Sequence, residues 1–211
     1  NALEEYPAYY TPITSQEGAI IVNTEAMKEN NLPTPTCLKD LADPVYKGFL
    51  SVVDIDGSST AWLMVQALIS EYGEDGAQEI LKGIYDNAGD HLEESGSGPI
   101  KKVRAGEVAV GFGLRHQALA DKKSGLPIDF IDPTEGNFSL TESVAVVDKG
   151  DKSNEKAMEM AECIIKNGRA ELLQTYPNPL YEGEKSDAAN ESKYPKKFSE
   201  KLTVELLEKH R

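Results

Sequence analysis

Three consecutive hydroxyl residues, Ser58, Ser59 and Thr60, lie between two stretches of different character. The preceding "FLSVVDI" (49–55) is typical of a strand, and the following residues, to Tyr72, have the apolar spacing of a helix. The first backbone N–H groups of a helix lack internal partners and carry partial positive charge. Together with the hydroxyls, they are suited to bind an anionic oxygen. Plain N-capping is the competing explanation, because one serine is enough to cap a helix.

A second polar helix start has a similar composition. In "EESGSGPIKKV" (93–103), Ser95, Gly96 and Ser97 precede a predicted helix that has Pro99 near its first turn. Small residues let a ligand approach the backbone closely. The alternative is again a cap with a flexible lead-in. Two such starts in one sheet favour a ligand site more than either start does alone.

Two further segments offer charged groups to the same ligand. Arg115 and His116, in "GFGLRHQAL" (111–119), follow a predicted strand, and Glu135 lies in the loop "DPTEGNF" (132–138). Arginine can grip a phosphate or carboxylate with two parallel hydrogen bonds, and histidine can donate to the same group. The glutamate can accept from a hydroxyl or amine elsewhere on the ligand. The alternatives are a solvated arginine and an exposed turn carboxylate.

Composition limits the classes of partner. The chain of 211 residues is 39% hydrophobic, and its formal charge is 22 − 36 = −14, which argues against nucleic acid. No apolar run approaches the roughly 18 residues of a membrane helix. No signal peptide is evident, and Asn1-Ala2 is interpreted as the scar of a cleaved tag.

Patterns for metal binding and catalysis are absent from the sequence. Cys37 and Cys163 lack any zinc or redox spacing, so we expect small buried side chains and no disulfide. The three histidines share no metal-ligand spacing, so neither a metal nor a cofactor is expected. There is no G-x-S-x-G, no P-loop and no H-E-x-x-H, which favours binding over catalysis.

The order of predicted elements indicates an α/β fold with helices on both faces of a sheet. Strands are predicted in 18–27, 49–55, 107–114, 127–132 and 139–150. Helices are predicted in 59–72, 77–87, 99–103, 115–125, 153–168 and the C-terminal tail. We expect the helix over 153–168 to end at Gly168 and a long polar loop to cover 178–196.

Five segments in series carry a family resemblance. They are "GAIIVNTEAM", "PTPTCLKDLADPVYKGFLSVVDIDGSSTAW", "SGSGPIKKVRAGEVAVGFGLRHQAL", "PTEGNFSLTESVAVVDKG" and "NEKAMEMAECII". Over about residues 12–170 the chain resembles the extracellular solute-binding proteins of bacterial ABC importers. The branch is that of the ferric-iron, phosphonate and hexose-phosphate binders, which have the type II periplasmic binding fold.

The resemblance implies one complete three-layer lobe with a mixed sheet and a partial second lobe of C-terminal helices. We expect a lead-in at 1–12, a complete ligand-binding lobe at 13–146 and a segment of the other lobe at 147–211. The family's first lobe begins with residues that precede anything in this chain, so a truncated protein is expected. Apolar residues such as Ile164 and Leu172 would then lack partners, and pairing of two copies is one remedy.

The resemblance also implies a function. The protein would capture a small anionic solute, a phosphonate or sugar phosphate, outside the cytoplasm and deliver it to an ABC permease without catalysing a reaction. The wall of its ligand cleft would contain Ser58–Thr60, Ser95–Ser97, Arg115, His116 and Glu135.

Ferric iron is the first rival ligand. Adjacent tyrosines, typical of the iron binders, are absent from "LRHQ", and Tyr9-Tyr10 precede the lobe. The other rivals are an enzyme acting on a phosphorylated small molecule through His116, and a fragment without a ligand.

Overall fold

The computed structural model describes residues 1–154, 156–199 and 203–210. The chain divides into two compact units. Unit 1 consists of Asn1–Gln16 and Leu140–Glu191, and unit 2 consists of Glu17–Ser139 and Ser192–Arg211. The prediction had placed 147–211 in one segment. The structure differs because the residues after Ser192 return to hydrogen-bond with the sheet of unit 2.

A mixed sheet forms the centre of unit 2, as the sequence predicted. Its strands are β1 (Thr11–Asn23), β2 (Leu50–Val53), β3 (Leu92–Glu93), β4 (Val110–Leu114), β5 (Ile128–Ile131), β6 (Asn137–Val144) and β7 (Pro195–Lys196). The strand order is β3-β2-β4-β1-β6-β7, and β5 pairs with β1. Strand β2 is parallel to β3 and β4, whereas β1 is antiparallel to β4 and β5. Strands β2, β3, β4 and β5 therefore all run in one direction.

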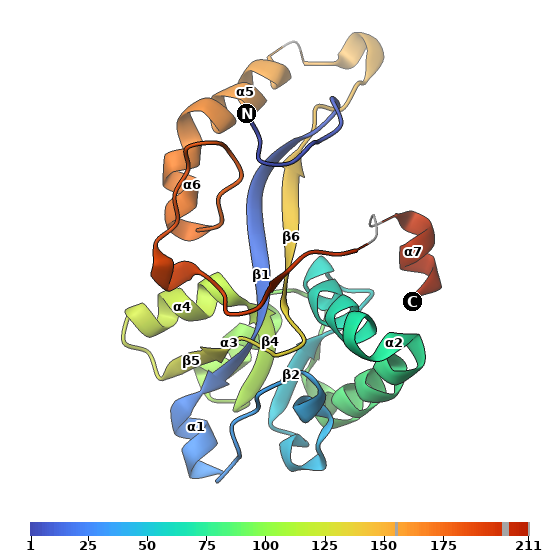
Figure 1. Ribbon diagram of the computed structural model, residues 1–211, viewed down its shortest axis with the longest axis vertical. Helices are drawn as coiled ribbons and strands as arrows, with labels where there is room; N and C mark the ends of the chain where they lie inside the picture. The colour runs from blue at the N-terminus through green and yellow to red at the C-terminus, as the bar shows by residue number, and fades with distance from the viewer. Residues whose placement is uncertain (155, 200–202, 211) are drawn as a thin grey trace. The chain divides into compact units, whose positions relative to one another are not determined.

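Helices pack on both faces of this sheet (Figure 1). The helices of unit 2 are α1 (Thr24–Glu29), α2 (Ser59–Ala88), α3 (Gly98–Ala105), α4 (Arg115–Lys123) and α7 (Val204–Lys209). On one face Ile21 of β1 packs in a buried cluster with Ile100 of α3 and Ala118 of α4. On the other face Phe112 of β4 and Leu63 of α2 lie against Gly18, where an added Cβ would be 2.5 Å from the phenylalanine ring. Period-two alternation in β1 thus supplies both cores.

Helix α2 contains a kink where the sequence predicted a break between two helices. Gly73 has φ 71° and ψ 174°, which is not helical, and the helix continues on both sides. Left-handed φ is accessible to glycine at little cost, so this position can absorb the change of direction. The predicted helices 59–72 and 77–87 are therefore the two halves of α2.

Short 3₁₀ segments connect the larger elements. They are Lys39–Ala42, Pro44–Tyr46, Gly89–His91, Gly150–Lys152 and Ala188–Asn190. In the first of them Asp40 caps the turn, because its carboxylate accepts from the backbone N–H groups of Thr36 and Cys37. The segment 30–48 is thus held by caps and turns, as its prolines predict.

Unit 1 contains helices α5 (Ala157–Cys163) and α6 (Arg169–Thr175), joined by a π-helical stretch, Ile164–Gly168. The expected end at Gly168 is wrong, because that glycine has φ −93° and the chain continues into α6. Ile164 and Leu172 are half-buried. Met158 and Met160 of α5 are exposed.

One buried ion pair organises unit 1. The Arg169 guanidinium donates to both carboxylate oxygens of Glu184, at 2.8 and 2.7 Å, and also to the carbonyl of Ile13. Glu184 further accepts from the backbone N–H groups of Leu180 and Tyr181. Burial opposes ionisation of Glu184, but the hydrogen bonds from Arg169 and the two N–H groups outweigh it, and the pKa is lowered.

Candidate functional site: a polar sheet edge in unit 2

The candidate residues lie where the parallel strands of unit 2 end. Because β2, β3, β4 and β5 run in one direction, the loops that follow them leave from the same edge of the sheet. In open α/β sheets this edge is where ligands usually bind. The starts of α2, α3 and α4 therefore share one edge of the sheet.

The hydroxyl run Ser58–Thr60 begins α2. Ser58 is the N-cap, and its Oγ accepts from the backbone N–H of Thr60 at 3.3 Å. Thr60 is buried, and its Oγ1 lies 3.5 Å from Ser58 Oγ. Ser59 is exposed. One hydroxyl therefore performs the capping, and the other two exceed what a cap requires.

The loop after β3 packs directly on this helix start. A Cβ added to Gly96 would lie 2.3 Å from Thr60 Oγ1 and 2.9 Å from Ser58 Oγ, so only glycine fits between the two loops. Ser97 is the N-cap residue of α3, yet among the described residues its side chain makes no cap hydrogen bond. Its Oγ lies instead 3.3 Å from Ser95 Oγ. Two of the sequence-predicted segments, 58–60 and 95–97, thus form one polar cluster at the starts of two helices.

A carboxylate lies beside this cluster. Glu93 Oε2 would be 2.4 Å from a Cβ on Gly98, the first residue of α3. Lys102 pairs with Glu93 at 2.9 Å and with Glu107 at 3.4 Å. The hydrogen bond to Glu93 is the main cause of the raised pKa of Lys102. The start of α3 therefore carries a negative side chain that is compensated by an adjacent ammonium group.

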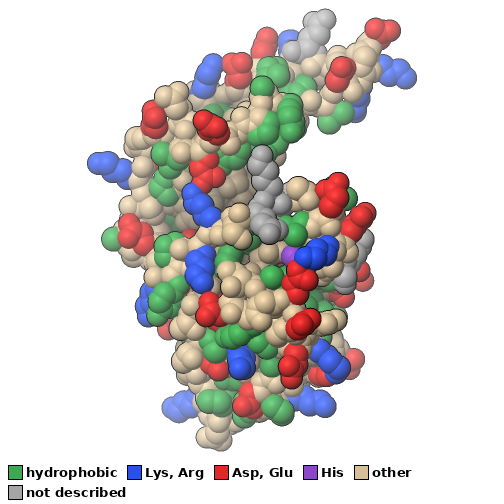
Figure 2. Space-filling model, turned by 45° about the vertical axis from the view of Figure 1, so that its right-hand side comes forward, with side chains coloured by type: hydrophobic (Ala, Val, Ile, Leu, Met, Phe, Trp, Pro, Cys, Tyr) green, Lys and Arg blue, Asp and Glu red, His purple; other side chains and the backbone are tan. Residues whose placement is uncertain are grey.

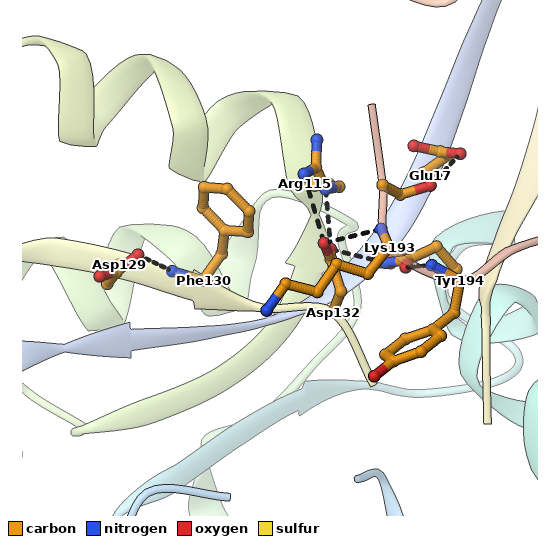
Figure 3. Close-up of polar contacts among 10 residues, drawn as sticks. Glu17, Arg115, Asp129, Phe130, Asp132, Lys193 and Tyr194 are labelled. Atoms are coloured by element: carbon orange, nitrogen blue, oxygen red, sulfur yellow. Dashed lines mark hydrogen bonds and ion pairs between the residues drawn. The ribbon is translucent and has the colours of Figure 1, made fainter. Parts of the chain in front are cut away.

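Arg115 lies at the same edge, but it is buried and faces a carboxylate (Figure 3). Its Nε donates to Asp132 Oδ1 at 2.7 Å and its Nη2 to Asp132 Oδ2 at 3.3 Å, and its guanidinium lies over the Phe130 ring at 4.6 Å. Asp132 also accepts from the backbone N–H of Lys193 and from Asn137. Arg115 was predicted to grip an anionic ligand, with a solvated surface arginine as the alternative. In this structure it neutralises Asp132, whose carboxylate also holds the returning chain.

Glu135 is also not open to a ligand in this structure. The residue is only 1% exposed, and its carboxylate accepts from the backbone N–H groups of Leu38 and Lys39 and from the Tyr72 hydroxyl, at 2.9 to 3.0 Å. Burial, followed by the nearby Glu135 charge, raises the pKa of Tyr72, so this hydroxyl stays protonated and donates. The predicted ligand-reading carboxylate instead joins the 38–39 turn to the kink of α2.

His116 is half-buried in the first turn of α4, beside Arg115. The sequence did not identify Asp132 or the segment 192–196, which complete this part of the edge. The signal for Asp132 was its position directly after β5, as Arg115 comes directly after β4. Nothing in the local sequence predicts the return of Lys193 and Tyr194, since that contact spans 61 and 57 positions.

Metal-binding groups of the usual type do not occur in the described part of the chain: no cluster of three or more His, Cys, Asp or Glu side chains is found there. Both cysteines are free thiols. Cys37 is half-buried, whereas Cys163 is exposed, so the predicted burial of Cys163 is wrong. Burial raises the pKa of the Cys37 thiol to about 11.

Within the described residues no helix has the length and apolarity needed to cross a membrane. Figure 2 shows acidic and basic side chains interspersed on the face that it presents, with no basic patch.

Residues 4–200 match the model of the family described as bacterial extracellular solute-binding protein, and the chain belongs to this family. By that description, members of the family bind a solute outside the cytoplasm. A curated relative from Haemophilus influenzae, named only as an uncharacterized protein, is 31% identical over 116 residues, which cover 54% of this chain and 33% of the relative.

Solved structures confirm the predicted type II periplasmic binding fold. AfuA from Actinobacillus pleuropneumoniae, solved with exogenous fructose-6-phosphate bound, has a TM-score of 0.73 at 22% identity and covers 86% of this chain. The periplasmic binding protein P5PA has a TM-score of 0.78 at 19% identity over 96% of this chain. Iron-bound HitA from Pseudomonas aeruginosa has a TM-score of 0.66 at 21% identity over 89%. The chain spans 58%, 63% and 62% of these three proteins, respectively.

Proposed function

We propose that this protein captures a small anionic solute, of the phosphonate or sugar-phosphate class, for an ABC importer. It binds the solute and catalyses no reaction, then presents it to the membrane permease. The proposed binding surface is the polar edge of unit 2 formed by Ser58–Thr60 and Ser95–Ser97, with His116 beside it. Arg115 and Glu135 support this edge from within the fold.

The observation that carries the proposal is the packing of Gly96 against Ser58 and Thr60. This packing brings the starts of α2 and α3 together, so partial positive charge from two helix ends is directed to one place. Hydroxyl donors at the same place add hydrogen bonds that an anionic oxygen accepts. An anionic solute gains from both the hydrogen bonds and the partial positive charge, whereas a neutral solute gains from the hydrogen bonds alone.

The similar solved structures include one with each of the two candidate ligands. AfuA was solved with fructose-6-phosphate bound, and HitA was solved with iron bound. The polar edge in this chain offers hydroxyl and N–H donors, which suit a phosphate group better than they suit ferric iron. The similar proteins give no support for the predicted pairing of two copies. This pairing forms no part of the proposal.

Ligand-observed NMR tests the proposal on the chain itself. The panel is inorganic phosphate, 2-aminoethylphosphonate, fructose 6-phosphate, a dicarboxylate and a polyamine, each at millimolar concentration. We expect selective binding of one phosphorus compound. Binding of the polyamine alone, or of every anion equally, would contradict the proposed site.

Matched variants then locate the binding surface. Ser59→Ala removes an exposed hydroxyl at the start of α2, and Gly96→Ala introduces a Cβ that collides with Thr60. Both should weaken the selected phosphorus compound. Ser70→Ala removes an exposed hydroxyl near the other end of the same half-helix and should leave the affinity unchanged. Equal effects of Ser59→Ala and Ser70→Ala would remove Ser59 from the site.

Two rival functions have direct readouts in the same samples. A ferric-iron protein with tyrosinate ligands would show a visible absorbance band on addition of iron, which we expect to be absent. An enzyme that uses His116 as acid or base would release inorganic phosphate from fructose 6-phosphate over time, and we expect no turnover.

A further inference from the structure

The C-terminal helix α7 lies against α2 at its kink, within unit 2 (Figure 1). It contacts both halves of α2. His210 stacks on Trp62 with ring centroids 6.2 Å apart and an interplanar angle of 30°, and its Nδ1 lies 3.0 Å from Gln66 Nε2. Lys209 forms an ion pair with Glu74, which is the first residue after Gly73.

His210 is the central residue of this contact. Its side chain is only 7% exposed although it lies near the end of the chain. Its Nε2 lies 3.7 Å from Glu74 Oε1, so a single imidazole faces the first half of α2 through Gln66 and Trp62 and the second half through Glu74. His210 therefore contacts residues on both sides of the kink.

The space beneath α7 confirms that the contact spans the kink. A cavity of ≈ 270 Å³ is bounded by Val65 and Leu68 from the first half of α2 and by Ala77 and Leu81 from the second half, with His210 at its edge. Nothing lies within 4 Å of a Cβ built on Gly73, so the backbone at the kink is not itself confined by packing. Side chains that touch both halves therefore add to the packing that sets the angle between them.

We propose that His210 is a positioning residue for the solute-binding helix. By docking α7 across the kink, it holds the first half of α2, and hence Ser58–Thr60, in place relative to the rest of unit 2. The Glu135–Tyr72 hydrogen bond at the last residue before Gly73 holds the kink from the sheet side. The consequence for solute affinity rests on the proposed function, whereas the docking and the positioning do not.

The chain offers a spectroscopic test, because Trp62 is its single tryptophan. We expect His210→Ala to shift the Trp62 emission to the red and to increase its quenching by acrylamide. His210→Phe, which keeps an aromatic ring on Trp62 and loses the Gln66 contact, should restore most of the emission. Glu208→Ala is the matched control, because Glu208 is an exposed residue of the same short helix. Identical emission from the His210→Ala and Glu208→Ala variants would overturn the docking.

Hydrogen exchange tests the positioning without any solute. In His210→Ala we expect faster exchange in peptides covering 59–72, and in Glu208→Ala we expect no change. If the emission shifts but exchange in 59–72 equals that of the control, α7 docks without positioning α2, and the proposal fails. Thermal unfolding of each variant distinguishes these local effects from global destabilisation.

Affinity for fructose 6-phosphate then links the two proposals. If the native chain binds it, His210→Ala should weaken binding roughly threefold or more, the size of effect expected for coupling through a packed element. Faster exchange in 59–72 with no binding by the native chain would support the positioning role and count against the proposed solute instead.

Discussion

At the scale of single residues, Glu93 is a negative side chain beside a surface that is proposed to bind an anion. Its carboxylate lies against Gly98 at the start of α3 and is compensated by Lys102. Glu93→Gln removes the charge and keeps the shape, so we expect it to tighten binding of the selected phosphorus compound by a few-fold. Titration by NMR measures the change, with Glu94→Gln, an exposed neighbour, as the control. Weaker binding in Glu93→Gln would mean that the carboxylate helps to build the site.

Arg115 gives a second prediction at this scale. Removing it leaves Asp132, with a side chain only 3% exposed, as an uncompensated buried charge. Breaking a buried pair in this way typically costs about 3–5 kcal/mol of stability. We expect Arg115→Ala to lower the urea midpoint of unit 2 strongly.

The double variant Arg115→Ala/Asp132→Ala distinguishes the two roles of Arg115. It should recover part of the lost stability, because no unpaired charge remains. If single and double variants are equally stable but both lose solute binding by tenfold or more, the original expectation of a ligand-binding arginine would hold instead.

The residue types at the site were predictable, but their partners were not. A hydroxyl-rich helix start and a glycine-containing loop were evident from local sequence, and the structure brings Thr60 and Gly96 into contact. Arg115 is paired with a carboxylate 17 positions away in the sequence. Glu135 accepts from a backbone N–H group 97 positions away. Local patterns carry no information about such pairings, so the burial of both side chains was missed.

At the scale of elements, the kink of α2 depends on Gly73. An alanine there must adopt φ near 71° with ψ near 174°, a nearly glycine-only region that costs about 1–3 kcal/mol for a residue with a Cβ. We expect Gly73→Ala to lower the melting temperature. Ser70→Ala, an exposed position three residues earlier, should change stability by less than about 0.5 kcal/mol. An unchanged melting temperature in Gly73→Ala would indicate that α2 straightens and relieves the strain.

Most elements of unit 2 were predicted to within a few residues, because their apolar periodicity is strong. The strands β2, β4 and β5 and the helices α3 and α4 fall inside predicted ranges or overlap them closely. Two misjudged helix ends have a common cause. Gly168 lies within continuous helical structure in this chain, and Gly73 bends a helix rather than ending it. A glycine indicates that a break is possible, and tertiary packing decides whether one occurs.

At the scale of the whole molecule, the buried ion pair of unit 1 should make that unit sensitive to acid. Hydrogen bonds from Arg169 and backbone N–H groups lower the pKa of Glu184 below its ordinary 4.5. A depressed carboxyl pKa contributes stability that is complete above the unfolded value and is lost as pH falls through the folded value. We therefore expect unit 1 to lose stability as pH falls below about 4.5, which can be followed by hydrogen exchange in peptides from 157–175.

Glu184→Gln provides the control for this prediction. The amide cannot titrate, so protection in unit 1 should be lower at neutral pH and nearly independent of pH in this range. A native chain whose unit 1 shows no loss of protection in acid would assign the stability of that unit to contacts other than the Arg169–Glu184 pair.

The division of the chain also determines when unit 2 can finish folding. Its first segment ends at Ser139, and the ribosome must make the 52 residues from Leu140 to Glu191 before the second segment begins at Ser192. Until then Asp132 lacks the backbone N–H of Lys193, and α2 lacks the helix that spans its kink. Whenever the chain emerges from its N-terminal side, unit 2 is therefore an incomplete intermediate until the residues from Ser192 onward have followed, and such intermediates expose surface that is prone to aggregate.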